Sequence, residues 1–316
     1  MPLLDMPLKE LKQYMGINPC PQDFDEYWKD ALFEADKVQL NIELQKIDYP
    51  AASIEVFDLY YTGTNNARIH ALYLRPVNIK YPAPCVLEFH GYTCSCGTIE
   101  SKLKWLTLGY QVLSMDCRGQ GGKSNDTGGV IGNTHNGHII RGIEDKNTLL
   151  YKHIFLDTYL LAKIADSFDT IDSKNIMTIG GSQGGALSLV CAALSPFVKK
   201  SAACYPFLTD YKRVWEMDYS GAYKEISEWF RRFDPAHERA DEIFTRLGYI
   251  DIKNLAPKIK ADVLTCACLK DETCPPSTIY AMYNHLKCGK KIIIYPDFVH
   301  EHIDHWSEES FKFLAE

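Results

Sequence analysis

Five segments of the chain are almost continuously apolar and have the length of a β-strand. A strand with one exposed face alternates apolar and polar residues, so continuous apolar segments indicate strands that are covered on both faces. This pattern is typical of a mainly parallel sheet with helices on each side. The segments span residues 85–90, 110–118, 175–181, 261–271 and 291–297.

Helical patterns separate or follow these segments. Strands that alternate with helices indicate βαβ units, and the sequence therefore predicts an α/β doubly wound fold. The predicted helices span residues 99–108, 149–167, 185–195, 278–286 and 305–315.

Two regions depart from this alternation. Residues 57–76 alternate apolar and polar positions around a Gly/Asn turn, which predicts an antiparallel hairpin at the sheet edge. Residues 211–254 are rich in Trp, Tyr, Arg and Asp and lack an apolar strand, so we expect a helical insertion that overhangs the strand ends. With an N-terminal extension over about residues 1–55, residues 1–316 are expected to form a single domain.

The composition narrows the function classes. Hydrophobic residues make up 46% and charged residues 24% of the 316 residues, which excludes a disordered, collagen-like or coiled-coil chain. The net charge of -7 provides no excess of positive charge for phosphates or anionic lipid, so nucleic acid is not an expected partner. No run of about 18 apolar residues occurs, so we expect no membrane span.

The first residues and the cysteines both favour a cytoplasmic protein. Asp5, Lys9 and Glu10 interrupt the N-terminus where a secretory signal needs an unbroken apolar region, so no export is predicted. The eleven cysteines are odd in number and several lie within apolar segments, which favours reduced thiols over a disulfide framework.

A glycine-rich turn joins one predicted strand to the predicted helix that follows it. Its sequence, Gly180-Gly181-Ser182-Gln183-Gly184, fits the pattern G-x-S-x-G in the strand, turn and helix context that this pattern requires. Glycines permit the sharp turn that exposes the serine hydroxyl at the edge of the sheet, beside a helix N-terminus. The alternative is an ordinary turn in which Ser182 caps the helix.

Two residues downstream of Ser182 qualify as its catalytic partners. A serine hydroxyl needs a histidine base that is oriented by a carboxylate, and in this fold the order is serine, acid, histidine at strand ends. Asp271 ends one predicted strand and His300 follows the next. We therefore expect Ser182 to contact His300, and His300 to contact Asp271. Glu272, beside Asp271, is the alternative acid.

Two backbone N–H groups are predicted to bind the oxyanion of such a reaction. In this motif one donor is the residue after the nucleophile, here Gln183, and the other comes from a loop after an early strand. That loop contains His90-Gly91-Tyr92, which makes Tyr92 the second candidate. The alternative interpretation of this tripeptide is a plain β-turn.

Two motifs raise the question of a bound metal. The histidines of "HEHIDH" at 300–305 do not have the spacing of a zinc-binding helix, and solvated loop histidines explain His302 and His305. Cys94-x-Cys96 lacks further ligands and is explained by two free thiols. We therefore expect neither a metal nor a cofactor.

Several motifs together resemble one known family. They are His90-Gly91-Tyr92, Arg118-Gly119-Gln120-Gly121, "GGSQGG" at 180–185, Asp271 with Cys274-Pro275-Pro276-Ser277-Thr278, and His300-Glu301. The chain resembles the acetyl xylan esterase and cephalosporin C deacetylase group of α/β hydrolases, which is the seventh carbohydrate esterase family. The likeness extends from about residue 23 almost to the end of the chain.

The resemblance implies an α/β-hydrolase fold and a serine esterase. Carried over by position, it makes Ser182 the nucleophile, His300 the general base and Asp271 its partner. It makes Tyr92 and Gln183 the oxyanion donors. It implies removal of acetyl groups from xylo-oligosaccharides or from related small acetate esters such as cephalosporin C. It also implies a cytoplasmic homohexamer built as a trimer of dimers.

Two segments depart from the family pattern. Residues 93–96 ("TCSC") replace glycine and arginine, and "HIDHW" after Glu301 replaces small residues, so we expect the mouth of the pocket to differ. The resemblance makes the loop of Arg118 structural, with Arg118 holding a carboxylate or nearby carbonyls. No chemistry is assigned to His138, which lies in a predicted loop.

Two further function classes remain open. One is another serine hydrolase of the same fold that acts on other acyl esters, thioesters or peptides and has a deeper acyl pocket. Rates with acetyl and octanoyl esters separate this class from an acetyl esterase. The other is a binding module that has lost a triad member, and the presence of Ser182, Asp271 and His300 counts against it.

Overall fold

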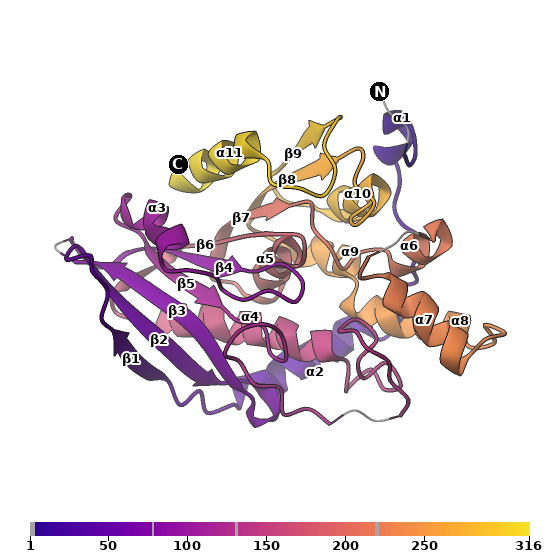
Figure 1. The fold of residues 1–316 in the computed structure, drawn as a ribbon, viewed down its shortest axis with the longest axis horizontal. Helices are drawn as coiled ribbons and strands as arrows, with labels where there is room; N and C mark the ends of the chain where they lie inside the picture. Colours follow the sequence, from indigo (N-terminus) through magenta and orange to yellow (C-terminus); the bar gives the residue numbers. More distant parts are fainter. Residues whose placement is uncertain (1–3, 78, 130–131, 219–220) are drawn as a thin grey trace.

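The computed structural model describes residues 4–77, 79–129, 132–218 and 221–316. Nine strands among these residues form one sheet in the order β1-β2-β3-β5-β4-β6-β7-β8-β9 (Figure 1). The pairs β1–β2, β2–β3 and β3–β5 are antiparallel, and every later pair is parallel. The strands are β1 (Glu43–Ile47), β2 (Ile54–Thr62), β3 (Arg68–Pro76), β4 (Ala83–Phe89), β5 (Gln111–Met115), β6 (Ile171–Gly181), β7 (Val198–Cys204), β8 (Asp262–Cys268) and β9 (Lys290–Tyr295).

Helices cover both faces of the sheet (Figure 1). Helices α4 and α5 pack on one face with α2 outside α4, whereas α3 and α11 pack on the other face. The helices are α1 (Leu8–Leu11), α2 (Phe24–Asp36), α3 (Leu103–Leu106), α4 (Leu150–Ser167), α5 (Gln183–Leu194), α6 (Tyr211–Met217), α7 (Lys224–Phe233), α8 (Ala240–Leu247), α9 (Ile252–Leu255), α10 (Pro276–His285) and α11 (Asp304–Ala315). None of these helices, within the described ranges, is both long and apolar enough to cross a bilayer.

Each face of the sheet has its own core, which explains the continuous apolar segments. In β4, Leu87 and Phe89 belong to the core that includes α4 and α5, whereas Val86 belongs to the core that includes α3 and α11. In β5, Leu113 and Val112 divide in the same way. Burial of such a side chain stabilises the fold by roughly 1.5–3 kcal/mol, so both faces of each strand gain from being apolar.

The predicted elements agree with this fold at most positions. The five apolar segments correspond to β4, β5, β6, β8 and β9, and the prediction of a mainly parallel sheet is confirmed. The hairpin is also confirmed as β2 and β3, although β1 pairs outside it and forms the edge. The helix predicted over 99–108 is wrong in extent, because a 3-10 turn (Glu100–Lys102) precedes the four-residue helix α3. β1 and β7 were not predicted.

Helices α6, α7 and α8 lie between β7 and β8 in the chain, within the range 211–254. Residues 219 and 220 of this range, and residues 1–3 of the N-terminal extension, lie outside the described residues. Helix α7 lies over the carboxyl end of β4, because Glu225 contacts Tyr92 in the turn that follows this strand.

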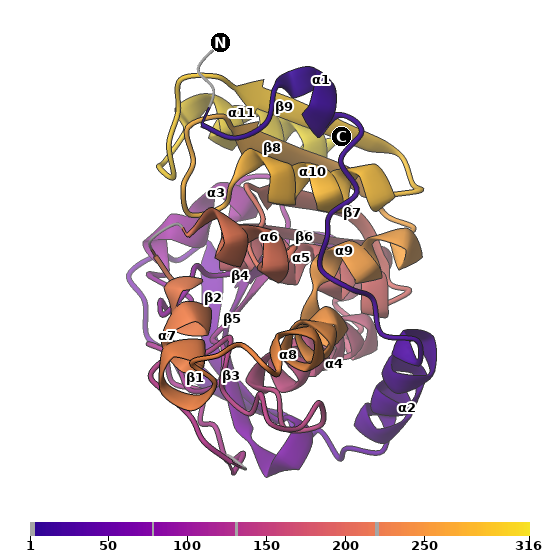
Figure 2. The ribbon, with the colours of Figure 1, turned by 90° about the vertical axis from the view of Figure 1, so that its right-hand side faces the viewer.

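The N-terminal segment runs along the outside of the fold, from α1 beside α10 to α2 beside α4 (Figure 2). Asp5 connects the beginning of this segment to α10 and α6. One carboxylate oxygen of Asp5 accepts from the Ser277 N–H at 2.7 Å, in the first turn of α10, and the other pairs with Arg213 at 2.8 Å. The segment therefore contributes directly to holding α10, which follows the loop of Asp271.

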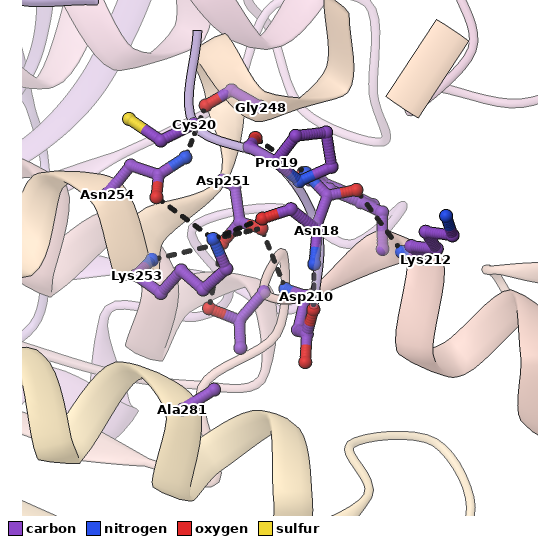
Figure 3. A network of polar contacts seen from close by, with 12 residues as sticks. Asn18, Pro19, Cys20, Asp210, Lys212, Gly248, Asp251, Lys253, Asn254 and Ala281 are labelled. Carbon is purple, nitrogen blue, oxygen red and sulfur yellow. Dashed lines mark hydrogen bonds and ion pairs between the residues drawn. The ribbon is translucent and has the colours of Figure 1, made fainter. Parts of the chain in front are cut away.

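A buried polar network holds the same segment at Ile17 and Asn18 (Figure 3). Asp210 accepts from the backbone N–H groups of Ile17 at 2.9 Å and Asn18 at 2.7 Å. Lys253 Nζ donates to the Asn18 carbonyl at 2.6 Å, and Asp251 accepts from the Asp210 N–H at 3.0 Å. Three segments that are distant in the sequence are thereby joined through groups that satisfy one another.

Candidate active site

Ser182 lies in a strained turn between β6 and α5. Its φ of 56° and ψ of -120° cost of order 1–3 kcal/mol for a residue with a side chain. The Ser182 N–H donates to the Cys204 carbonyl at 3.0 Å, and its carbonyl accepts from the Phe207 N–H at 3.1 Å. The loop after β7 therefore holds the strained turn in place. The side chain makes no capping hydrogen bond to α5, so the capping alternative does not apply.

Close backbone contacts explain two of the glycines around Ser182. A Cβ on Gly184 would lie 2.0 Å from the Phe89 carbonyl oxygen. A Cβ on Gly185 would lie 2.7 Å from the Cys204 carbonyl oxygen. The first turn of α5 thus approaches the ends of β4 and β7 at distances that only glycine permits.

Gly184→Ala is expected to lower the free energy of unfolding by about 1–3 kcal/mol, because α5 or the end of β4 must move to admit the methyl group. Gly181→Ala is the matched control, since a Cβ there meets the Cys204 Cβ at an ordinary 3.6 Å. Urea unfolding of both variants measures the difference. Equal stabilities of the two variants would contradict the close-contact explanation.

His300 and Asp271 meet at the carboxyl ends of β9 and β8. His300 Nδ1 donates to Asp271 Oδ2 at 2.8 Å, which leaves Nε2 as the basic nitrogen. Asp271 is fully buried, and its Oδ1 accepts from the N–H groups of Thr273 and Cys274, each at 2.8 Å. Glu272, the alternative acid, is exposed. The carboxylate that faces His300 is therefore Asp271.

The Ser182 hydroxyl lies against the Cys274 thiol. Burial raises the pKa of this thiol well above its ordinary value, whereas the contact with the hydroxyl lowers it. The thiol also lies within 4.8 Å of a carboxylate oxygen of Asp271 and a ring nitrogen of His300, so Cys274 is a common neighbour of Ser182 and of the His300–Asp271 pair. Among the described residues, no hydrogen bond joins Ser182 to His300. Catalytic hydrogen bonds often tighten only with bound substrate, and this contact stays a prediction.

Tyr205 contributes to the site although the sequence did not single it out. Its ring centroid lies 4.6 Å from that of His300, and its hydroxyl donates to the Glu301 carbonyl at 2.9 Å. Both the imidazole and the loop that carries it are therefore supported by Tyr205. This residue follows β7, which was not predicted, so the sequence contained no signal for it.

The backbone N–H groups of Tyr92 and Gln183 come from turns on neighbouring strands. Phe89 in β4 lies opposite Gly180 in β6, and Tyr92 and Gln183 each follow this pair by the same number of residues. Within the described part of the chain, neither N–H donates a hydrogen bond. Both groups are therefore free to bind an oxyanion.

The Gln183 side chain fastens these two turns together. It is fully buried, and its Nε2 donates to the carbonyls of His90 at 3.3 Å and Gly91 at 3.4 Å. Its Oε1 accepts from the Tyr151 hydroxyl at 2.6 Å and from Gln120 Nε2 at 2.9 Å. Gln120 belongs to the loop of Arg118, which the resemblance made structural, and it supports the turn that carries Tyr92.

Arg118 has the structural role that the resemblance implied. Its guanidinium is fully buried and forms two hydrogen bonds to the Asp157 carboxylate, at 2.7 and 2.6 Å. It also donates to the Thr64 carbonyl at 3.1 Å. The implied contacts with a carboxylate and a carbonyl are thus confirmed.

The histidines beside His300 have other partners. His302 Nε2 lies 3.2 Å from the Asp304 carboxylate, and His305 Nδ1 lies 2.9 Å from the Tyr295 hydroxyl. In the described ranges, the clusters of metal-ligand atoms do not include His302 or His305. The two side chains are therefore explained by local hydrogen bonds.

Cys96 belongs to a buried cluster with His70 and Asp116. The His70 ring lies between Asp116 at 2.7 Å and Asp58 at 2.8 Å, and Asp116 also accepts from the Cys96 N–H at 2.6 Å. Burial raises the pKa of the Cys96 thiol to about 12, and Cys94 is exposed. Hydrogen bonds therefore account for the cluster, and the two cysteines have different surroundings.

The fold and the site together define a class. A mainly parallel sheet carries a strained serine turn after β6, an acid after β8 and a histidine after β9, and this is the arrangement of the α/β hydrolases. Within this class, the chain belongs to the acetyl xylan esterase family. The family model described as acetyl xylan esterase (AXE1) matches residues 1–316.

Similarity to known proteins in sequence and in structure supports this family assignment. The acetyl esterase Axe7A of Xylanibacter ruminicola is 29% identical over 293 residues, which cover 89% of this chain and 63% of that protein. The chain thus spans less than two thirds of the length of this relative. Acetyl xylan esterase 1 from a Thermoanaerobacterium species has a structure with a TM-score of 0.97 and 49% identity, with 99% of each chain covered.

Two further structures are similar to different degrees. An acetyl xylan esterase from a Paenibacillus species superposes with a TM-score of 0.95 at 35% identity, covering 98% of this chain and 99% of that one. A cold-adapted esterase from an Arctic intertidal metagenomic library has a TM-score of 0.56 at 12% identity, covering 86% and 98%. The second likeness concerns the fold alone.

Proposed function

We propose that the chain is a serine esterase that removes acetyl groups from acetylated xylo-oligosaccharides or from related small acetate esters such as cephalosporin C. The observation that carries this proposal is the convergence of the strained Ser182 turn, the His300–Asp271 pair and two free backbone N–H groups at one end of the sheet. Membership in the acetyl xylan esterase family supports the acetyl group as the acyl part.

The first step forms an acetyl-enzyme. Ser182 Oγ attacks the acetyl carbonyl carbon while His300 Nε2 accepts its proton, and Asp271 stabilises the resulting imidazolium. The oxyanion is bound by the N–H groups of Tyr92 and Gln183, and loss of one such donor costs roughly 3–4 kcal/mol. His300 then donates its proton to the leaving sugar oxygen.

The second step releases acetate. His300 Nε2 accepts a proton from water as the water oxygen attacks the acetyl carbon of the intermediate. The same two N–H groups bind the second oxyanion, and the proton returns to Ser182 Oγ as acetate leaves. This chemistry requires no metal or cofactor.

Serine-directed fluorophosphonate labelling, mapped by peptide, followed by a series of acyl esters, tests both the site and the class. We expect the label on Ser182, with acetyl esters hydrolysed fastest. Each methylene that a small pocket cannot accommodate lowers kcat/KM by about 10- to 200-fold. A label on another residue would refute the site. An octanoyl ester hydrolysed faster than the acetyl ester would favour a serine hydrolase for longer acyl groups.

The family resemblance supports two further parts of the proposal. The esterase works in the cytoplasm as a homohexamer, a trimer of dimers, with a small acetylated sugar or ester as its substrate. Residues 1–316 form one α/β-hydrolase domain, in which the N-terminal extension and the helical insertion over about residues 211–254 are parts of the same unit.

A further inference from the structure

The Tyr92 hydroxyl joins three segments that are distant in the sequence. It donates to Glu225 Oε1 in α7 and accepts from the His138 N–H at 2.9 Å. The other oxygen of Glu225 accepts from the N–H groups of Ile139 at 2.9 Å and Ile140 at 3.2 Å. One carboxylate thus holds the turn after β4, the loop that carries His138 and the helix α7 to one another.

The surroundings leave the carboxylate and the tyrosine little freedom. Glu225 is 7% exposed, and a Cβ on Gly137 would lie 1.9 Å from its Oε2. The Tyr92 ring packs edge-on against His138 and Phe207, with centroid distances of 5.1 and 5.8 Å. A change at Glu225 is therefore transmitted to Tyr92 rather than absorbed by empty space.

The turn that carries Tyr92 contains backbone strain and needs support. Thr93 has a φ of 62°, in the left-handed region that β-branched residues rarely adopt. On one side, the Thr93 N–H donates to Gln120 at 2.9 Å, and Gln120 bonds to Gln183. On the other side, the Tyr92 hydroxyl is held by Glu225. The strained turn that carries the Tyr92 N–H is thus held by hydrogen bonds on both sides.

We propose that Glu225 is a positioning residue of the esterase reaction: by holding the Tyr92 side chain, it directs the Tyr92 N–H at the oxyanion. This inference rests on the proposed function, because it assigns Glu225 a role in that reaction. Glu225 acts through Tyr92 and not on the substrate.

The charge of Glu225 determines how strongly it holds Tyr92. Burial raises the pKa of Glu225 to about 7, although its hydrogen bonds act in the opposite direction. The titratable groups that face it are Tyr92 in the turn, Tyr151 in α4 and Tyr211 in α6, and the His138 ring packs against Tyr92. Burial raises the pKa of the three tyrosines, so they stay neutral near pH 7. Deprotonation of Glu225 replaces a neutral hydrogen bond with Tyr92 by a stronger charge-assisted one.

Glu225→Gln preserves the shape of the side chain and removes the charge. We expect kcat with 4-nitrophenyl acetate to fall about 10- to 100-fold, because a displaced oxyanion donor weakens binding of the transition state. KM is expected to change less than about threefold. Glu228→Gln is the matched control, because Glu228 lies on the same helix and pairs with Arg232 at 3.7 Å. We expect this control to retain the kcat of the parent protein.

The pH dependence of kcat distinguishes a positioning role of Glu225 from a role in packing alone. Between about pH 6 and pH 8 the parent gains the carboxylate whereas Glu225→Gln stays neutral, so the ratio of parent to variant kcat is expected to rise with pH. Tyr92→Phe removes the hydroxyl but keeps the Tyr92 N–H. We expect it to lower kcat to the same extent, and the double variant to be no slower than the slower single variant.

A kcat for Glu225→Gln equal to that of the parent, or a ratio that stays constant or falls as the pH rises, would overturn the positioning role. If Glu225→Gln does not fold, Tyr92→Phe decides the matter, and a parent-like kcat in that variant overturns the role. A parent that hydrolyses no acetate ester refutes the proposed function itself. If the parent is active and its rate is insensitive to both substitutions, the positioning role of Glu225 is refuted and the proposed function is not.

Discussion

Ser182→Ala is expected to abolish ester hydrolysis, with a loss of kcat on the order of 10⁶. The substitution removes the hydroxyl that attacks the acetyl carbon and leaves the oxyanion donors in place. The fold is expected to persist, because alanine and serine place the same Cβ in the strained turn, whose φ is 56°. The measurement is kcat with 4-nitrophenyl acetate, together with circular dichroism of both proteins.

Ser195→Ala provides the matched control for this result. Ser195 follows the other end of α5, where its hydroxyl accepts from the Phe197 N–H at 3.2 Å, so its loss leaves the site intact. This control is expected to keep full activity and to bind the fluorophosphonate label, whereas Ser182→Ala does neither. Activity of Ser182→Ala within about tenfold of the parent would exclude Ser182 as the nucleophile.

The apolar pattern predicted the strands that are apolar on both faces and missed β7, which lies in the middle of the parallel part of the sheet. β7 has the sequence "VKKSAAC", which contains two lysines and mainly small residues. Its Ser201, Ala202 and Ala203 are fully buried because the strand lies between β6 and β8. The tendency of this segment to form a strand comes from its two neighbours, which no local pattern contains.

The catalytic candidates are likewise recognisable from local sequence, whereas the residues that support them are not. Ser182, Asp271 and His300 each follow a predicted strand, so their positions along the chain were sufficient to select them as candidates. Glu225 is separated from Tyr92 by 133 positions and lies in the insertion, so no spacing rule connects the two. The loop of His138 was assigned no chemistry. That assignment missed its contact, because the His138 N–H donates to Tyr92.

Asp271→Asn is expected to lower kcat by about 10⁴. Asp271 Oδ1 accepts from the backbone N–H groups of Thr273 and Cys274, and an asparagine satisfies both only with its amide oxygen at that place. The amide NH₂ then faces His300 Nδ1, which must become an acceptor, so the imidazole proton moves to Nε2. A nitrogen that already carries a proton cannot accept the proton of Ser182.

Glu272→Gln is the matched control for the acid, because Glu272 is the exposed neighbour of Asp271. We expect it to retain parent activity, since no contact of His300 is changed. The rate of fluorophosphonate labelling is expected to fall in Asp271→Asn but not in Glu272→Gln, because attack on phosphorus needs the same base as attack on the acetyl carbon. The reverse pattern would make Glu272 the acid and would require the loop after β8 to rearrange.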